Sequence, residues 1–254
     1  MLSQARTPNF GRWPGLSEIL SEILEQMVQH ESRYSSFFVA VAALFVTCLV
    51  ISNVIAVKLA MVQGLVLPAG IVIFPVSYLL ADVLTEVYGY RAARRVIWLG
   101  FFCNLLAVIA IWVGGLLPAA PFWDGQGAYE TILGATPRLL AASFAAYLVG
   151  EFANTMIMSR LKIAMAGRHL WARAIGSTLV GQGLDSAVFI TIAFWGLMPL
   201  PILIGSVVTQ WLVKSAYEAL ATPLTYAMVG FLKRREGIDA YDHGISFNPF
   251  VLRD

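Results

Sequence analysis

The sequence predicts an all-α integral membrane protein with six transmembrane helices and both termini in the cytoplasm. Composition is the first observation: 59% of the 254 residues are hydrophobic, only 13% are charged, and the mean hydropathy is +0.75. A soluble domain carries about 25% charged residues, and one core could not bury so much apolar surface. The composition therefore excludes a cytosolic enzyme, a nucleic-acid-binding protein and a disordered chain.

Six segments are long and apolar enough to cross a bilayer, which requires about 20 residues. They cover residues 37–62, 71–88, 96–117, 139–159, 174–198 and 201–232. Gly64, Pro68 and Gly70 precede or open the second segment, so residues 63–73 are expected to form an irregular or re-entrant stretch. The expected organisation is an N-terminal amphipathic segment (1–36), a six-helix transmembrane domain (37–232) and a C-terminal tail (233–254).

Basic residues predict the orientation of the six helices. They gather between the second and third spans, between the fourth and fifth, and after the sixth: Arg91, Arg94, Arg95, Arg160, Lys162, Arg168, Arg173, Lys233, Arg234 and Arg235. Lys and Arg are enriched in cytoplasmic connections. All of these connections lie on one side of a six-span protein, so both the N-terminal segment and the tail are expected to be cytoplasmic.

Two segments outside the spans have a recognisable pattern. Apolar residues between Ile19 and Val28 recur at helical spacing opposite a row of glutamates, which predicts an amphipathic helix packed on the bundle or lying at the interface. The connection 118–137 contains Phe122, Trp123 and Tyr129, which is typical of an external segment at the membrane surface.

Polar residues inside the spans predict the functional site. An ionisable group within a membrane costs at least a few kcal/mol, so such groups normally face an interior cavity and one another. The spans contain, in order, Asn53 and Lys58; Asp82, Thr85 and Glu86; Asn104; Glu151 and Asn154; Gln182 and Asp185; and Gln210, Lys214 and Glu218. Several pairs are three or four residues apart and share a helix face.

The interior carries an excess of acid, because five carboxyl groups accompany only two lysines. Some of these carboxyls are therefore expected to be neutral, or to await a cationic or hydrogen-bond-donating ligand. The pattern predicts a solute site between the helices. The structural alternative is that Lys214 and Glu218 neutralise each other within one helix, while the amides join helices by hydrogen bonds.

Enzyme chemistry has little support in the sequence. The three histidines lie outside the spans, and no Walker loop, H-E-x-x-H or G-x-S-x-G motif is present. Cys48 and Cys103 lie within apolar runs and are expected to be small buried residues. No cofactor or metal is expected, and a membrane-embedded enzyme using Asp82 and Glu86 is the less favoured alternative.

One long run, PAGIVIFPVSYLLADVLTEVYGYRAARRVIW, resembles the bacterial queuosine precursor transporter family, also called the vitamin uptake transporter family. The resemblance continues through ISNVIAVKL, EFANT, GQGLDS and QWLVKSAYEALATP and covers approximately residues 45 to 230. It implies a multi-pass protein of the bacterial inner membrane that imports 7-deazaguanine bases for queuosine in tRNA. It also implies an architecture similar to the substrate-binding subunits of energy-coupling-factor importers, without their ATPase partner.

A 7-deazaguanine base presents an N–H group and an amino group side by side, which one carboxylate can accept together. An aminomethyl form adds a positive charge and would use a second carboxylate. The candidate residues are Glu86, Glu151 and Asp185 for the ring edge; Asn53, Asn154 and Gln182 for orientation; Lys58 or Lys214 for charge balance; and Tyr78, Trp211 and Tyr217 for stacking. Asp82 and Glu218 complete the set.

Three questions stay open at the level of sequence. Uptake is either facilitated or proton-coupled, with Glu86 and Glu218 as candidate proton carriers. The alternative function is a subunit that binds another planar heterocycle or vitamin and needs a separate ATP-driven module. The expected partners are a small-molecule substrate and the lipid bilayer, without nucleic acid, and the protein is either a monomer or a homodimer.

Overall fold

The computed structural model describes residues 35–56, 58–62, 65–134 and 137–251. Nearly all of them belong to one compact unit, Phe37–Asp254. The amphipathic helix expected near residues 19–28 lies outside the described residues.

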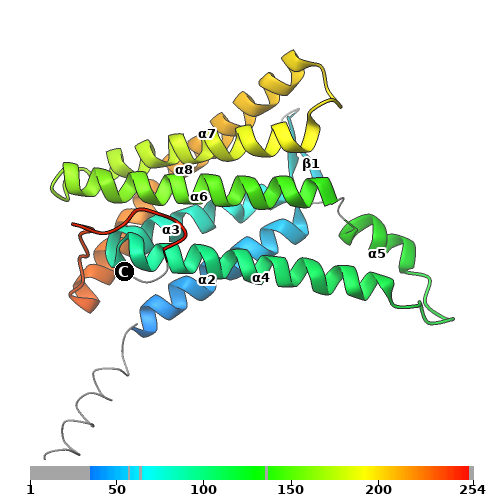
Figure 1. Cartoon of the computed structure of the whole chain (residues 1–254), viewed down its shortest axis with the longest axis horizontal. Helices are drawn as coiled ribbons and strands as arrows, with labels where there is room; N and C mark the ends of the chain where they lie inside the picture. Colours follow the sequence, from blue (N-terminus) through cyan, green and yellow to red (C-terminus); the bar gives the residue numbers. More distant parts are fainter. Residues whose placement is uncertain (1–34, 57, 63–64, 135–136, 252–254) are drawn as a thin grey trace, which may run out of the picture. The chain divides into compact units, whose positions relative to one another are not determined.

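Helices make up most of this unit (Figure 1). They are α2 (Ser36–Ile55), α3 (Phe74–Tyr88), α4 (Tyr90–Leu116), α5 (Gln126–Leu133), α6 (Pro137–Ala164), α7 (Leu170–Phe194) and α8 (Leu200–Glu236). Between α2 and α3 lie two short strands, β1 (Leu59–Val62) and β2 (Leu65–Pro68), and a 3₁₀ turn, η1 (Ala69–Val72). The strands pair antiparallel, with Leu59 opposite Pro68 and Val62 opposite Leu65.

Four helical regions of the described chain are long and apolar enough to cross a membrane: Ser36–Ile55, Tyr90–Leu116, Leu170–Phe194 and a fourth that includes α6, Pro137–Ala164. The fold class is therefore a helical, multi-pass membrane protein. Helix α3 has only 15 residues, which extend about 22 Å against a hydrocarbon core of about 30 Å. Helix α8 is longer, with 37 residues, but carries charged side chains along its apolar length.

The first expected span is too long at its C-terminal end. Helix α2 ends at Ile55 and not at Val62, and the chain enters the β1–β2 hairpin in place of a purely irregular stretch. The hairpin forms hydrogen bonds between backbone groups that a broken helix would leave unpaired. A membrane environment requires such pairing, because it offers no water to those groups. Lys58 consequently lies outside the helix and is exposed.

Helix α3 forms the centre of the bundle. It packs against α4, α6 and α8, and every residue from Ser77 to Val87 is buried. Helices α6 and α7 approach each other closely, because a Cβ atom added at Gly181 would lie 2.8 Å from Cβ of Asn154 and 3.0 Å from the carbonyl oxygen of Gly150. Small residues at such crossings allow close backbone contact in membrane bundles.

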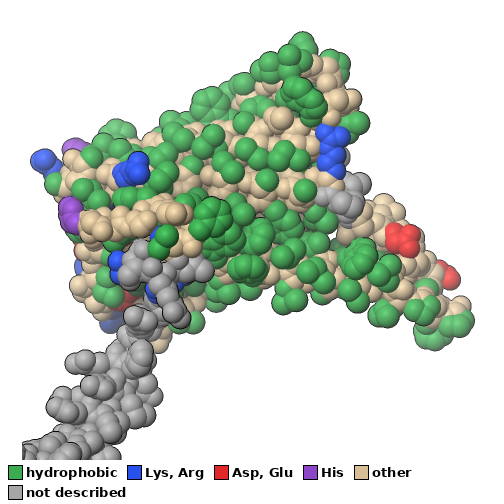
Figure 2. Space-filling view, in the orientation of Figure 1, with side chains coloured by type: hydrophobic (Ala, Val, Ile, Leu, Met, Phe, Trp, Pro, Cys, Tyr) green, Lys and Arg blue, Asp and Glu red, His purple; other side chains and the backbone are tan. Residues whose placement is uncertain are grey.

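Hydrophobic side chains cover the outer surfaces of the helices in the space-filling view (Figure 2). Helix α4 shows the pattern most clearly, with exposed residues at helical spacing: Leu99, Phe102, Leu106, Ile109, Val113 and Leu116. In a membrane this row faces lipid, because a soluble protein rarely exposes so large an apolar patch.

The C-terminal segment folds back over the helix ends, and we call residues 237–251 the C-terminal strap. In Figure 1 it is the red chain beside α3. The backbone N–H of Ala240 donates to the carbonyl of Val87 at 3.1 Å. The Asp242 carboxylate accepts hydrogen bonds from the backbone N–H of Tyr90 at 2.8 Å and from the Ser159 hydroxyl at 2.5 Å. The strap thus ties α3, α4 and α6 together at one end.

Candidate functional site

Polar side chains occupy three successive levels along the bundle, and α3 carries one residue at each level. Phe74 borders a cavity, Asp82 belongs to a group of buried carboxyls and Glu86 belongs to a group of ion pairs. Asp82 and Glu86 are four residues apart and share one face of α3, and Phe74 lies at the opposite end of the helix, eight residues before Asp82.

The first level is a cavity of about 140 Å³ between α2, η1, α3, α6, α7 and α8. It holds roughly ten times the volume that one water molecule requires. Its walls are mostly apolar, and the side chains that could orient a ligand are Asn53, Ser143, Tyr147, Asp185, Gln210 and Lys214. Phe74 and Phe189 add two aromatic rings to the wall. A largely apolar hollow with a few polar groups is typical of a small-molecule site.

An ion pair crosses this cavity wall. Lys214 Nζ of α8 lies 2.5 Å from Asp185 Oδ2 of α7, and both side chains are mostly buried. The same ammonium group lies 4.7 Å from the centre of the Phe74 ring, a cation–π contact. The Gln210 side-chain oxygen has no hydrogen-bond partner among the described residues, so it is available to a ligand.

The second level, which we call the carboxyl cluster, consists of Asp82 on α3, Glu151 on α6 and Glu218 on α8. Their exposed fractions are 1%, 0% and 4%. Asp82 Oδ1 accepts a hydrogen bond from Asn154 Nδ2 at 2.9 Å. The other five carboxyl oxygens have no partner at hydrogen-bond distance and angle within the described part of the chain, although the Thr178 hydroxyl of α7 lies beside Glu218 and interacts with it. Buried polar atoms are normally paired, so a group of unpaired ones indicates a ligand, water or proton that completes it.

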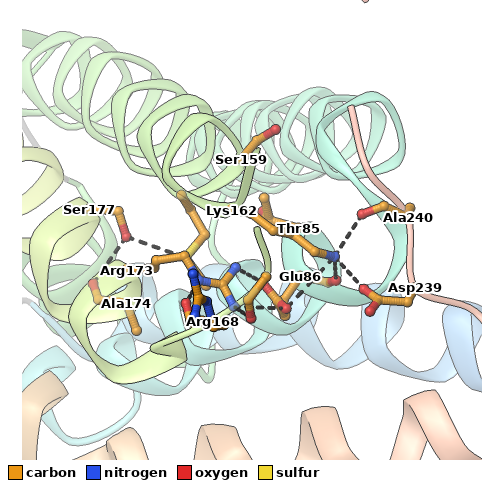
Figure 3. Close-up of polar contacts among 12 residues, drawn as sticks. Thr85, Glu86, Ser159, Lys162, Arg168, Arg173, Ala174, Ser177, Asp239 and Ala240 are labelled. Atoms are coloured by element: carbon orange, nitrogen blue, oxygen red, sulfur yellow. Dashed lines mark hydrogen bonds and ion pairs between the residues drawn. The ribbon is translucent and has the colours of Figure 1, made fainter. Parts of the chain in front are cut away.

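The third level, which we call the ion cluster, consists of Glu86, Lys162, Arg173, Lys233 and Asp239. Figure 3 labels Glu86, Lys162, Arg173 and Asp239. The guanidinium of Arg173 donates hydrogen bonds to both carboxylate oxygens of Glu86. Lys233 Nζ lies 2.6 Å from Glu86 Oε1 and 2.8 Å from Asp239 Oδ1. Lys162 Nζ donates to the Glu86 carbonyl at 2.6 Å and to Asp239 Oδ1 at 2.5 Å. The cluster joins α3, α6, α7, α8 and the C-terminal strap.

Asp239 lies outside the helices, at the solvent-facing edge of the ion cluster. Partial burial opposes its ionisation, but hydrogen bonds from Lys162 and Lys233 outweigh that effect and hold the pKa of its carboxyl below the ordinary value of 3.8. The strap is therefore attached by a charged group that remains ionised at physiological pH.

The structure places the expected site residues in three different environments. Asn53, Asp185 and Lys214 line the cavity. Tyr78, Asp82, Glu151, Asn154, Gln182 and Glu218 are buried at or beside the carboxyl cluster. The remaining four residues do not line the cavity. Lys58 is exposed beyond α2, and Glu86 is in the ion cluster. Trp211 donates its indole N–H to the carbonyl of Leu179 at 2.8 Å, and Tyr217 is 40% exposed.

Sequence reasoning missed the aromatic wall of the cavity and the cations of the ion cluster. Phe74, Tyr147 and Phe189 each lie four residues from a polar residue on the same helix, at Tyr78, Glu151 and Asp185, so helical spacing could have indicated them. In the sequence, Lys162 and Arg173 mark only the orientation of the helices, yet they are 2% and 0% exposed.

The family of the chain can be identified from its sequence. A sequence model described as "Putative vitamin uptake transporter" matches residues 68–228, more than half of the chain. The chain belongs to this vitamin uptake transporter family. The matched region of the family member runs from β2 to α8 and contains the cavity residues from Gly70 onward together with the carboxyl cluster.

Three curated relatives are similar to this vitamin uptake transporter family member. The "Probable queuosine precursor transporter" of Bacillus subtilis is 33% identical over 180 residues, which cover 70% of this chain and 78% of the relative. The "Queuosine precursor transporter" of Escherichia coli is 31% identical over 122 residues, covering 48% and 52%. A Haemophilus influenzae protein named "Probable queuosine precursor transporter" is 29% identical over 126 residues, covering 50% and 51%. No solved structure matches the chain.

Proposed function

We propose that the protein is a transporter, not an enzyme, that imports queuosine precursors, the 7-deazaguanine bases, across the bacterial inner membrane. The observation that supports it best is the family membership together with relatives named for this transport. A small, mostly apolar cavity with a few polar groups inside a helical membrane bundle is the arrangement such a function needs.

The proposed topology has six crossings, formed by α2, α3, α4, α6, α7 and α8, with both termini in the cytoplasm. Basic residues support this orientation, because Lys162 and Arg173 flank the α6–α7 connection and Lys233 ends α8 on the side of the ion cluster. The short α3 crosses together with the hairpin that precedes it. A six-helix bundle of this kind is the basis for the proposed similarity to energy-coupling-factor substrate-binding subunits.

The proposed substrate site is the cavity. Asp185 offers a carboxylate to the paired N–H groups of the ring edge, and Lys214 offers a donor to the ring carbonyl. Phe74 and Phe189 provide faces for stacking, and Asn53 is placed to orient the base. Binding separates the Asp185–Lys214 ion pair, and an analogue that lacks the donors would not replace it, so the site would discriminate strongly against that analogue.

Binding and uptake test this proposal with a matched pair of variants. Purified protein is titrated with 7-deazaguanine bases and with adenine, and bacteria that lack their own importer and precursor synthesis are assayed for queuosine in tRNA. Selective thermal stabilisation and restored queuosine are expected for the wild type and for Asp124→Asn, an exposed acid far from the cavity in sequence. Asp185→Asn should lose both. Wild-type protein that restores no queuosine would refute the proposal.

The alternative is a binding subunit for another planar vitamin that relies on a separate ATP-driven module. The family description, which names vitamins, favours keeping this alternative. The purified protein in proteoliposomes would then bind its ligand without any net uptake. Uptake of a 7-deazaguanine by the protein alone would exclude it.

A further inference from the structure

We propose that Asp82, Glu151 and Glu218 form a proton-binding centre that couples substrate import to proton entry. This inference rests on the proposed import function and adds the driving ion. The centre lies beside the substrate cavity but does not line it.

The geometry of the carboxyl cluster is the first support. Three helices each contribute one carboxyl group to the same buried region, where Glu218 and Glu151 both interact electrostatically with Asp82. Five of the six oxygens have no hydrogen bond of ordinary geometry from the described residues; Glu218 has only the nearby Thr178 hydroxyl, and the buried side-chain oxygens of Asn154 and Gln182 also lack partners there. If the cluster were purely structural, these buried polar atoms would stay without hydrogen bonds, at a large cost in the free energy of folding.

The surrounding charges are the second support. From α3 the cluster faces Tyr78 and Glu86, from α6 Tyr147, and from α7 Arg173 and Asp185. Lys214 of α8 pairs with Asp185, and Cys103 of α4 interacts electrostatically with Tyr147. Both cations near the cluster are already engaged, because Arg173 pairs with Glu86 and Lys214 pairs with Asp185.

Neutralisation of the cluster must therefore come from another source. Three carboxylates without hydration or a counterion do not remain ionised together in a low-dielectric interior. Protons neutralise them with the fewest new contacts.

A connection from the cavity to the cluster is the third support. Asp185 and Tyr147 line the cavity, and both interact electrostatically with a member of the cluster, Glu151. The Tyr78 hydroxyl is fully buried, has no hydrogen-bond partner among the described residues and lies among Asp185, Glu151 and Glu218. It can therefore pass a proton between the cavity side and the cluster.

The ion pair of the cavity supplies the coupling step. When a substrate ring edge takes the Asp185 carboxylate, Lys214 loses its carboxylate partner and keeps only the neutral ring carbonyl as an acceptor, and Glu218 is four residues further along the same helix face. The ammonium, no longer neutralised by Asp185, favours the ionised form of Glu218, so the Glu218 proton leaves toward the cytoplasm. A proton from the external side then enters through the cavity and neutralises the cluster again. One proton enters for each base imported.

Proteoliposomes containing only the purified protein test this inference with a radiolabelled 7-deazaguanine. We compare uptake under an inward proton gradient, under an inward sodium gradient, and as exchange with unlabelled base at equal pH. The proton gradient is expected to concentrate the base inside, up to about tenfold per pH unit for one proton per molecule. The sodium gradient should have no effect.

Glu151→Gln and Glu218→Gln should each reduce the ratio of gradient-driven uptake to exchange to that seen without a gradient, whereas Asp124→Asn should keep the wild-type ratio. Wild-type exchange without any response to the proton gradient would overturn the coupling and leave the import function standing. Wild-type protein with neither exchange nor uptake would refute both. Accumulation driven by sodium, or a normal response to the proton gradient in both glutamine variants, would also overturn the proton centre. If a variant fails to fold, the response of the wild type to the proton gradient still tests the coupling.

Discussion

Loss of the Glu86 carboxylate should strongly destabilise the protein, although the sequence favours Glu86 as a ligand for substrate. Glu86 is 1% exposed, and its carboxylate contacts Arg173, Lys233 and Lys162. At an effective dielectric constant near 20, one pair of charges about 4 Å apart contributes about 4 kcal/mol. Breaking a buried pair by removing one partner costs about 3–5 kcal/mol, because the other charge remains buried.

Charge within the ion cluster predicts an asymmetry between the two partners. Two acids and three bases give the cluster a net charge of +1. Glu86→Gln raises the net charge to +2, whereas Arg173→Gln lowers it to zero and leaves Glu86 in contact with Lys233. We therefore expect Glu86→Gln to cost about 3–5 kcal/mol and Arg173→Gln to cost less.

Thermal unfolding of the purified protein in detergent measures both costs. A loss of this size corresponds to a fall in Tm of roughly 10 °C for a chain of this length, and Asp124→Asn is the control for loss of an exposed acid. The double variant should be less destabilised than the sum of the single variants, since no unpaired charge is left at this pair. A fall of Tm below about 2 °C for Glu86→Gln, or a larger effect for Arg173→Gln, would refute the reasoning.

Three further predictions concern the packing of the bundle and the C-terminal strap. Asp242→Asn should weaken the attachment of the strap by about 1–3 kcal/mol, seen as faster proteolysis of the C-terminal segment; an unchanged cleavage rate would contradict it. Gly181→Ala should destabilise by about 1–3 kcal/mol because its Cβ meets the α6 backbone, whereas Gly205→Ala, with open space around it, should not; equal Tm values would be the contrary result. Folding lowers the pKa of Asp239, so the stability that its carboxylate contributes is present above about pH 4 and is lost as the pH falls further. The difference in Tm between the wild type and Asp239→Asn should therefore shrink below that pH. A difference that grows there would contradict the prediction.

The sequence predicted most of the buried polar residues within the spans. Spacings of three or four residues place Asp82 with Glu86 and Glu151 with Asn154 on common helix faces, and the structure buries all four side chains. Helical periodicity is a local property, so a sequence displays it without knowledge of the tertiary structure. The same periodicity could not say which faces meet, and it grouped Glu86 with the substrate ligands.

The lengths of the helices could not be predicted as well. Apolar runs suggested a first span ending at Val62, but the helix ends at Ile55, because a hydrophobic run of this composition suits both a helix and the strands that follow. Helices α6 and α8 extend beyond their apolar runs and bring Lys162 and Lys233 into contact with Glu86. Hydropathy does not detect such extensions, because it measures transfer into lipid and not pairing with a buried partner.

The sequence by itself determined that this is a helical membrane protein, that its interior is rich in acid, and to which family it belongs. These properties depend on composition, periodicity and local motifs, which are properties of the sequence itself. Only the tertiary structure separated the acids into three roles: Asp185 paired beside a cavity, Asp82, Glu151 and Glu218 together without a counterion among the described residues, and Glu86 bound by cations from three helices. The reason is physical, because the state of a buried carboxyl depends on the charges that other helices bring within a few ångströms of it.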